Sequence, residues 1–237
     1  MEKKLLYGFG DSLVDGHCVH CGMLDALAEK YGMVYRKYAI NGAAVIPCKE
    51  DSCEAGLSAG IPVPDVAAQI EAASGEAPDF ICFDGLTNDA YPHTVKMHMG
   101  SITGSYGGNY DTSTFYGAFE RVCFLLRKKY MDSRIFYICV HKMPTRDMAV
   151  QEILHRAARE VCEKWSIPCV DIFRKGQINT CVDGMRQKYS YDTAQSLTDG
   201  NGTHLNPAGY EKWYLPMIEE AMGEGLRIYF PPGFSGA

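Results

Sequence analysis

Short apolar runs alternate along this chain with longer segments of helical periodicity, and this alternation constrains the fold more than any other feature. Within the helical segments, apolar residues recur every three to four positions, as a helix with one buried face requires. The predicted strands are 5–9, 34–40, 80–83, 135–140 and 167–172, and the predicted helices between and after them are 23–31, 66–73, 114–130, 148–165 and 207–222. Repeated strand–helix alternation is typical of a parallel sheet covered by helices on both faces. We therefore predict an α/β protein with a roughly five-stranded parallel sheet.

Composition narrows the classes of protein and partner. A length of 237 residues with 46% hydrophobic and 22% charged residues suits a single domain over 1–237. The net charge of −6 argues against a nucleic-acid or anionic-membrane partner. No run approaches the roughly 20 apolar residues that span a bilayer. The N-terminus has no apolar core of a signal peptide, so we expect a cytoplasmic protein whose ten cysteines are reduced thiols.

Two segments, 91–113 and the similarly polar 187–202, do not fit the alternation. Segment 91–113 is rich in Gly, His, Tyr and Thr, and long loops of this kind usually border binding sites. We expect it to be an active-site insert over the ends of the strands. Segment 225–237 ends in Pro231-Pro232-Gly233 and is expected to be a C-terminal tail, a docking strand followed by a frayed end.

The first predicted strand runs directly into Gly10-Asp11-Ser12-Leu13. A serine on a sharp turn between a strand and a helix presents its hydroxyl at the carboxyl edge of the sheet, where nucleophiles of α/β hydrolases lie. The same four residues also make an ordinary turn with a helix cap, so the motif needs support from elsewhere in the chain.

Three further polar positions follow in an order that supplies this support. Gly42 closes the second strand, where the absence of a Cβ lets a backbone N–H approach a substrate. Asn88 follows the third strand and offers an amide donor for an oxyanion. His204 precedes the last helix and could act as general base toward Ser12. Each alone could be a turn glycine, an Asx-turn or a cap, but the four together are specific.

With these blocks the chain resembles the SGNH/GDSL hydrolases, from Gly10 to His204. That family carries Gly-Asp-Ser-Leu, Gly, Gly-x-Asn-Asp and Asp-x-x-His blocks in this order. The resemblance implies a flavodoxin-like three-layer α/β/α fold and esterase, lipase, deacetylase or acyltransferase activity with no cofactor. It also implies that Ser12 is the nucleophile, His204 the base, and the N–H groups of Ser12 and Gly42 with the Asn88 side chain the oxyanion donors.

The sequence departs from the family pattern at two positions. Leu86 stands where the third block has glycine, and Gly85 comes one residue early. Asn201 stands where the fourth block has its acid. Either Gly200 and Asn201 form a small insertion and Asp199 supplies the carboxylate, or Asn201 orients His204 through its amide oxygen. We favour Asp199, with Asn201 as the alternative.

Other residues at the same edge are candidates for substrate contact or for a metal site. Asp11, Asp89, Tyr91 and His141 follow predicted strands and are expected to contact substrate. The segment 17–21, His-Cys-Val-His-Cys, looks like half of a zinc site but has no second ligand pair at a suitable spacing. We expect it to form the loop after the nucleophile, with no metal.

These features predict a serine hydrolase that cleaves carboxylic esters through an acyl-Ser12 intermediate. We expect a small-molecule ester with a short acyl group, such as an acetylated carbohydrate, because no continuous apolar stretch resembles a lipid-binding lid. An acyltransferase with the same site remains open, as does a non-catalytic ligand-binding protein, for which Asn201 and Leu86 argue. A flavodoxin-like cofactor binder is disfavoured because the first strand does not end in a phosphate-cradling loop. The oligomeric state is left open.

Overall fold

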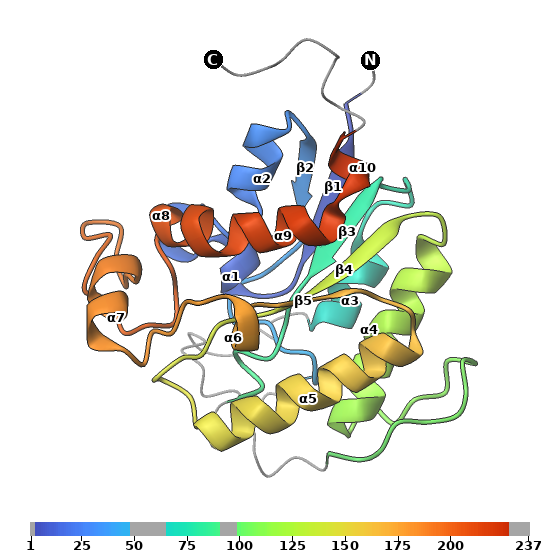
Figure 1. The fold of residues 1–237 in the computed structure, drawn as a ribbon. Helices are drawn as coiled ribbons and strands as arrows, with labels where there is room; N and C mark the ends of the chain where they lie inside the picture. Colours follow the sequence, from blue (N-terminus) through green and yellow to red (C-terminus); the bar gives the residue numbers. More distant parts are fainter. Residues whose placement is uncertain (1–2, 48–64, 91–98, 228–237) are drawn as a thin grey trace.

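The computed structural model describes residues 3–47, 65–90 and 99–227, and within them a single parallel sheet forms the centre of the molecule (Figure 1). The strand order is β2-β1-β3-β4-β5, and every neighbouring pair is parallel. The strands are β1 Leu5–Phe9, β2 Val34–Lys37, β3 Phe80–Phe83, β4 Arg134–Cys139 and β5 Cys169–Asp171. This confirms the predicted three-layer α/β/α fold.

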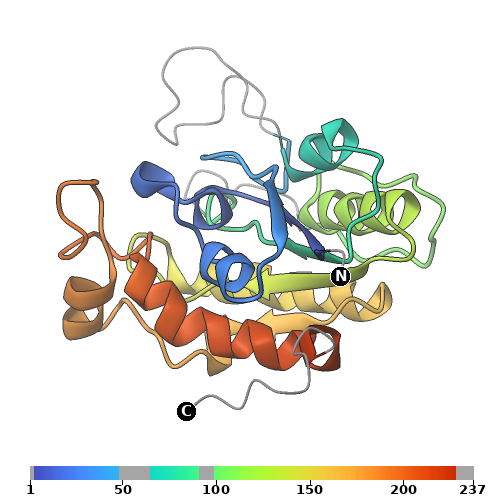
Figure 2. The same cartoon turned by 90° about the horizontal axis from the view of Figure 1, so that it is seen from above.

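Helices cover both faces of the sheet (Figure 1, Figure 2). The helices that pack on the first face are α3 Val66–Ala72, α4 Phe115–Lys129 and α5 Met148–Lys164. Those on the second face are chiefly α2 Asp25–Lys30, the π-helical turn η3 Tyr210–Tyr214 and α9 Leu215–Met222. The shorter helices are α1 Ser12–Asp15, η1 His17–Val19, α6 Ile172–Lys175, α7 Asp183–Tyr189, α8 Pro207–Gly209 and α10 Glu224–Arg227.

The side chains of β1 show why the sheet needs two helical layers. Leu5, Tyr7 and Phe9 point into the core formed with α3, α4 and α5. Leu6 points into the other core, formed with α2 and α9. Successive side chains of a strand alternate between faces, so a continuously apolar strand is stable only when both faces are covered.

The last helical run is continuous although it comprises three elements. α8, η3 and α9 follow one another without a break from Pro207 to Met222, as the sequence predicts. Asn206 caps the start through its side-chain oxygen, which accepts from Gly209 N at 2.8 Å. The π-helical turn in the middle places Tyr214 against the loop after β4, which matters for the site below.

Several predicted boundaries differ from the structure. The strands β2 Val34–Lys37 and β5 Cys169–Asp171 are shorter than the predicted 34–40 and 167–172. Residues 225–227 belong to the short helix α10, so the expected docking strand does not begin there, and 228–237 lie outside the described residues. Of the predicted active-site insert, 91–98 also lie outside the described residues. The described remainder, 99–113, packs on α4 and α5. Lys164 Nζ, at the end of α5, donates to the carbonyls of Thr103 (2.9 Å) and Ser105 (2.6 Å) in this segment. The same ammonium group pairs with the buried Glu120 of α4.

No helix in the described parts of the chain is long and apolar enough to cross a membrane.

Candidate active site

Ser12 is held at the carboxyl edge of the sheet by the turn that follows β1. Gly10 has a φ of 136°, and a Cβ on it would lie 1.7 Å from Asp84 Oδ1, so this turn requires glycine. Asp11 caps α1 by accepting from Leu13 N at 2.9 Å. Ser12 is therefore the first helical residue, where a backbone N–H has no partner inside the helix.

His204 lies beside this serine although the two are 192 positions apart in the sequence. Ser12 Oγ is 2.9 Å from His204 Nε2, a hydrogen-bonding distance. The backbone carbonyl of His204 accepts from Tyr191 N at 3.1 Å, which ties the residue to the loop after α7. The structure thus brings the predicted nucleophile and base into direct contact.

His141, predicted to contact substrate, is fully buried and supports the loop that carries His204. One ring nitrogen, Nε2, lies 3.0 Å from the carbonyl oxygen of Gly202, and the other, Nδ1, lies 2.7 Å from the hydroxyl of Tyr214. Burial lowers the pKa of His141 to about 4, so the ring is neutral at physiological pH and donates from Nε2 to Gly202. The expected substrate contact is wrong for this residue, because both of its ring nitrogens are used inside the protein.

The loops after β2 and β3, which carry the predicted oxyanion donors, are bound to each other. Asn88 Nδ2 donates to the carbonyl oxygen of Ala43 at 2.8 Å. The Asp89 carboxylate accepts from Val45 N at 2.9 Å and Ile46 N at 3.0 Å. Asp89 is 1% exposed, so it fixes the loop of Gly42 and does not face solvent, contrary to its predicted substrate contact.

Two buried carboxyl groups lie directly beneath the nucleophile. Asp84 Oδ1 accepts from Asp11 N at 3.0 Å, and both side chains are fully buried. Burial raises the pKa of Asp11 to about 6, and burial together with the charge of Asp11 raises the pKa of Asp84 well above its ordinary value. Asp11 acts here as a helix cap and not as the expected substrate contact.

Similarity to known proteins is found in structure and not in sequence. No family model and no curated protein matches the chain. A Lactobacillus plantarum protein of known structure shares 16% identity and superposes with a TM-score of 0.67, covering 97% of this chain and 98% of that one. A Bacteroides ovatus structure described as a GDSL-like lipase gives 13% identity and a TM-score of 0.61 over 94% and 99% of the two chains. A lipase/acylhydrolase from Enterococcus faecalis gives 16% and 0.54 over 92% and 95%.

The chain has the fold of the SGNH/GDSL hydrolases. Leu86 marks its first departure from the SGNH pattern, since it stands where that pattern has glycine. Its φ is 138° and its side chain is 1% exposed, so a buried leucine occupies a backbone conformation that L-residues rarely adopt. Arg146 Nε donates to the carbonyl oxygen of Thr87 at 2.6 Å and holds this strained loop in place.

The second departure from the SGNH pattern concerns the acid. Asp199 is exposed, with its carboxylate accepting from the Thr198 hydroxyl at 3.1 Å. The side-chain oxygen of Asn201 accepts from Thr203 N at 2.9 Å. Among the residues that the structure describes, none bonds to His204 Nδ1, which is buried. Neither predicted third member therefore orients the ring, because each side chain is engaged within its own loop.

His17, which the sequence placed in the loop after the nucleophile, also lies at this site. Its ring lies flat on that of His204, with ring centres 3.9 Å apart and planes 5° apart. Burial, together with weaker electrostatic contributions from His17, His141 and Arg146, lowers the pKa of His204 to about 3. The described residues hold no group of three or more His, Cys, Asp or Glu side chains that could bind a metal ion. Tyr91 lies outside the described residues.

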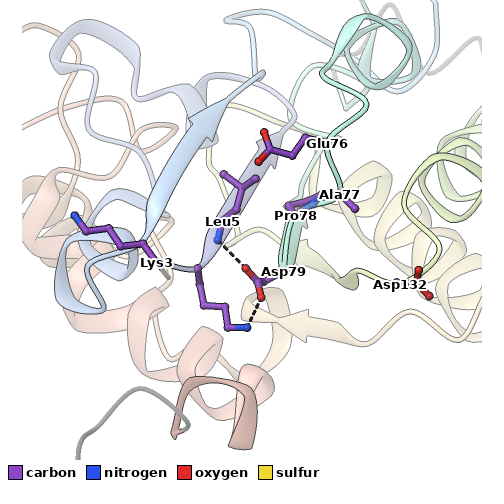
Figure 3. Close-up of a pocket in the computed structure, with 8 residues that line it drawn as sticks. Lys3, Leu5, Glu76, Ala77, Pro78, Asp79 and Asp132 are labelled. Carbon is purple, nitrogen blue, oxygen red and sulfur yellow. Dashed lines mark hydrogen bonds and ion pairs between the residues drawn. The ribbon is translucent and has the colours of Figure 1, made fainter. Parts of the chain in front are cut away.

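A polar hollow of about 370 Å³ lies at the other end of the strands, away from this site. The start of β1 lines it, and the Asp79 carboxylate there accepts from Leu5 N at 2.9 Å and pairs with Lys4 (Figure 3). Its lining contains neither Ser12 nor His204.

Proposed function

We propose that this protein is a serine hydrolase that cleaves carboxylic esters, with Ser12 as nucleophile and His204 as general base. The observation that carries the proposal is the 2.9 Å distance between Ser12 Oγ and His204 Nε2 at the carboxyl edge of the sheet. Structural neighbours described as a GDSL-like lipase and a lipase/acylhydrolase support hydrolysis as the reaction class.

The proposed reaction has two steps. In the first, Ser12 Oγ attacks the ester carbonyl carbon, its proton passes to His204 Nε2, and the alcohol leaves with that proton as the C–O bond breaks. In the second, water attacks the acyl-Ser12 carbonyl, gives a proton to His204, and releases the acid as Ser12 recovers its proton. The N–H groups of Ser12 and Gly42 and the amide of Asn88 would stabilise the oxyanion in both steps.

The charge state of His204 suits a base but not a strong one. With a pKa lowered to about 3, the ring is neutral at physiological pH and can accept a proton. Accepting at Nε2 requires the ring proton to lie on Nδ1, which is buried and for which the described part of the chain provides no acceptor. A buried unsatisfied donor costs about 1–3 kcal/mol. We therefore propose a slow enzyme, in which a Ser-His pair acts without a carboxylate.

The proposed substrate is a small ester with a short acyl group, such as an acetylated carbohydrate. Support comes from the sequence, which has no continuous apolar stretch suited to a lipid-binding lid.

A ligand-binding role without turnover is the second candidate function. This role is favoured because His204 Nδ1 has no partner in the ranges 3–47, 65–90 and 99–227, so no acid there enforces a productive tautomer.

Hydrolysis of p-nitrophenyl acetate and butyrate, together with labelling by a fluorophosphonate probe, separates these candidates. We expect slow hydrolysis by the wild type, and loss of both hydrolysis and labelling in Ser12→Ala. Ser196→Ala, which removes the hydroxyl of an exposed serine, is the matched control and should keep both. A folded wild type with neither hydrolysis nor labelling would sink the hydrolase proposal and leave ligand binding as the function. Adding alcohol acceptors tests for acyl transfer, which would appear as a new ester in place of free acid.

A further inference from the structure

The flat contact between His17 and His204 is the feature of this site that the proposed reaction leaves unused. Parallel rings 3.9 Å apart at 5° cannot hydrogen-bond in the ring plane, so the contact is a stack and not a proton relay. Tyr191 borders both rings, with its ring centre 6.1 Å from His17 and 6.3 Å from His204.

The loop that carries His17 is fixed on two sides. Lys37 Nζ donates to the carbonyl oxygens of Asp15 (3.0 Å) and His20 (2.8 Å), on either side of His17. Cys18 Sγ donates to the carbonyl oxygen of Asp192, in the loop that leads to His204, at 3.7 Å. The His17 ring is thus presented to His204 by a loop that is anchored both to β2 and to the chain before His204.

The two ring nitrogens of His204 differ in their hydrogen bonding. In an acid-containing triad the bond at Nδ1 fixes both the tautomer and the plane of the imidazole. Here Nδ1 has no partner among the described residues, and Ser12 contacts only Nε2. A single hydrogen bond at Nε2 fixes the plane of the ring less firmly than bonds at both nitrogens would.

We infer that His17 is a positioning residue for His204, whose stacked ring fixes the plane of the imidazole in place of a triad acid. The inference rests on the proposed function, since it assigns a role within the same reaction. The stack acts through ring shape. A charge on His17 would work against the imidazolium that forms on His204, so a flat neutral ring should serve as well as imidazole.

Kinetics of His17→Ala and His17→Phe with p-nitrophenyl acetate test this role. We expect His17→Ala to lower kcat about tenfold, which corresponds to about 1.4 kcal/mol, with KM within about twofold of the wild type. His17→Phe keeps a flat ring and should restore kcat to within about threefold. His20→Asn is the matched control, because His20 is exposed on the same loop, does not stack on His204, and has a φ of 50° that asparagine tolerates. It should change neither parameter.

Carbethoxylation of His204 by diethyl pyrocarbonate, read by peptide mass spectrometry, tests the stack without any turnover. We expect His204 to react several-fold faster in His17→Ala than in the wild type or His17→Phe. An inactive, unlabelled wild type would end the hydrolase proposal, yet this reaction would still decide whether His17 covers His204. Three results would overturn the inference: unchanged kcat and His204 reactivity in His17→Ala, a change in KM alone, or a loss in His17→Phe as large as in His17→Ala.

Discussion

Among the described residues no acid bonds to His204 Nδ1, and this leads to a specific prediction for Asp199→Ala. In a serine protease, replacing the triad acid by Asn costs about 10⁴ in kcat, or about 5.4 kcal/mol of barrier. The Asp199 carboxylate is exposed and bonds to the Thr198 hydroxyl instead of His204. We therefore expect kcat/KM for p-nitrophenyl acetate to stay within about twofold of the wild type, since a surface hydrogen bond contributes only about 0.5 kcal/mol.

Asn201→Ala should have a small but measurable effect for a different reason. The variant loses the acceptor for Thr203 N, one residue before His204. Such a bond contributes about 1 kcal/mol, so kcat/KM should fall by at most about fivefold through loosening of the loop.

Asp183→Ala is the matched control for both variants, because Asp183 is an exposed acid that pairs with Arg186 on α7. A loss of 100-fold or more in Asp199→Ala or Asn201→Ala, with Asp183→Ala unchanged, would refute the reasoning. It would mean that the loop before His204 rearranges in the working protein and brings that side chain to Nδ1.

Three further predictions concern the loops beneath the site. Leu86→Gly and Leu86→Ala both remove a buried side chain, but only glycine adopts a φ of 138° without strain. The glycine variant should therefore be about 1 kcal/mol more stable than the alanine variant in urea unfolding, whereas alanine is usually the more stabilising residue. Gly10→Ala should lower the free energy of unfolding by several kcal/mol, because the new Cβ meets the Asp84 carboxylate. Gly184→Ala is the control in thermal melts, because the space around the new methyl group is open and the free energy of unfolding should change by less than about 1 kcal/mol. Burial raises the pKa of Asp89 from 3.8 to about 6, so the folded state binds its proton more tightly than the unfolded state. This contribution to the free energy of unfolding is complete below pH 3.8 and is lost as the pH rises through 6. Relative to Asp89→Asn, the free energy of unfolding of the wild type should fall by up to about 3 kcal/mol between pH 4 and pH 7. Unfolding free energies of the two proteins that change in parallel with pH would contradict this.

The local pattern of the chain was sufficient to predict the layers of the fold. Strands such as Phe80–Phe83 are buried on both faces, which makes them continuously apolar, and α4 and α5 carry one apolar stripe each. Both signals depend on neighbours in the sequence. The four-residue helices α1 and α6 were missed because about one turn is too short to show a period, and α7 was missed because its buried residue is Tyr189 alone, which makes no apolar stripe.

For the residues of the site, too, the sequence could predict some properties and not others. The sequence placed Ser12 and His204 at one edge of a parallel sheet, because both follow from strand ends and motif order. It also placed Asp11, Asp89 and His141 there, but could not tell a side chain that faces substrate from one that is buried beneath the loops. Burial depends on how the loops fold over one another, which no single motif contains.

The sequence by itself thus determined the sheet, its helical layers and the edge at which polar side chains gather, since these depend on apolar periodicity and chain order. Only the tertiary structure decided which groups touch. It placed Ser12 Oγ 2.9 Å from His204 Nε2, kept Asp199 away from the ring, and stacked His17 on it. Contacts between loops distant in the sequence depend on distances of a few ångströms, which the packing of the whole chain fixes and local patterns do not record.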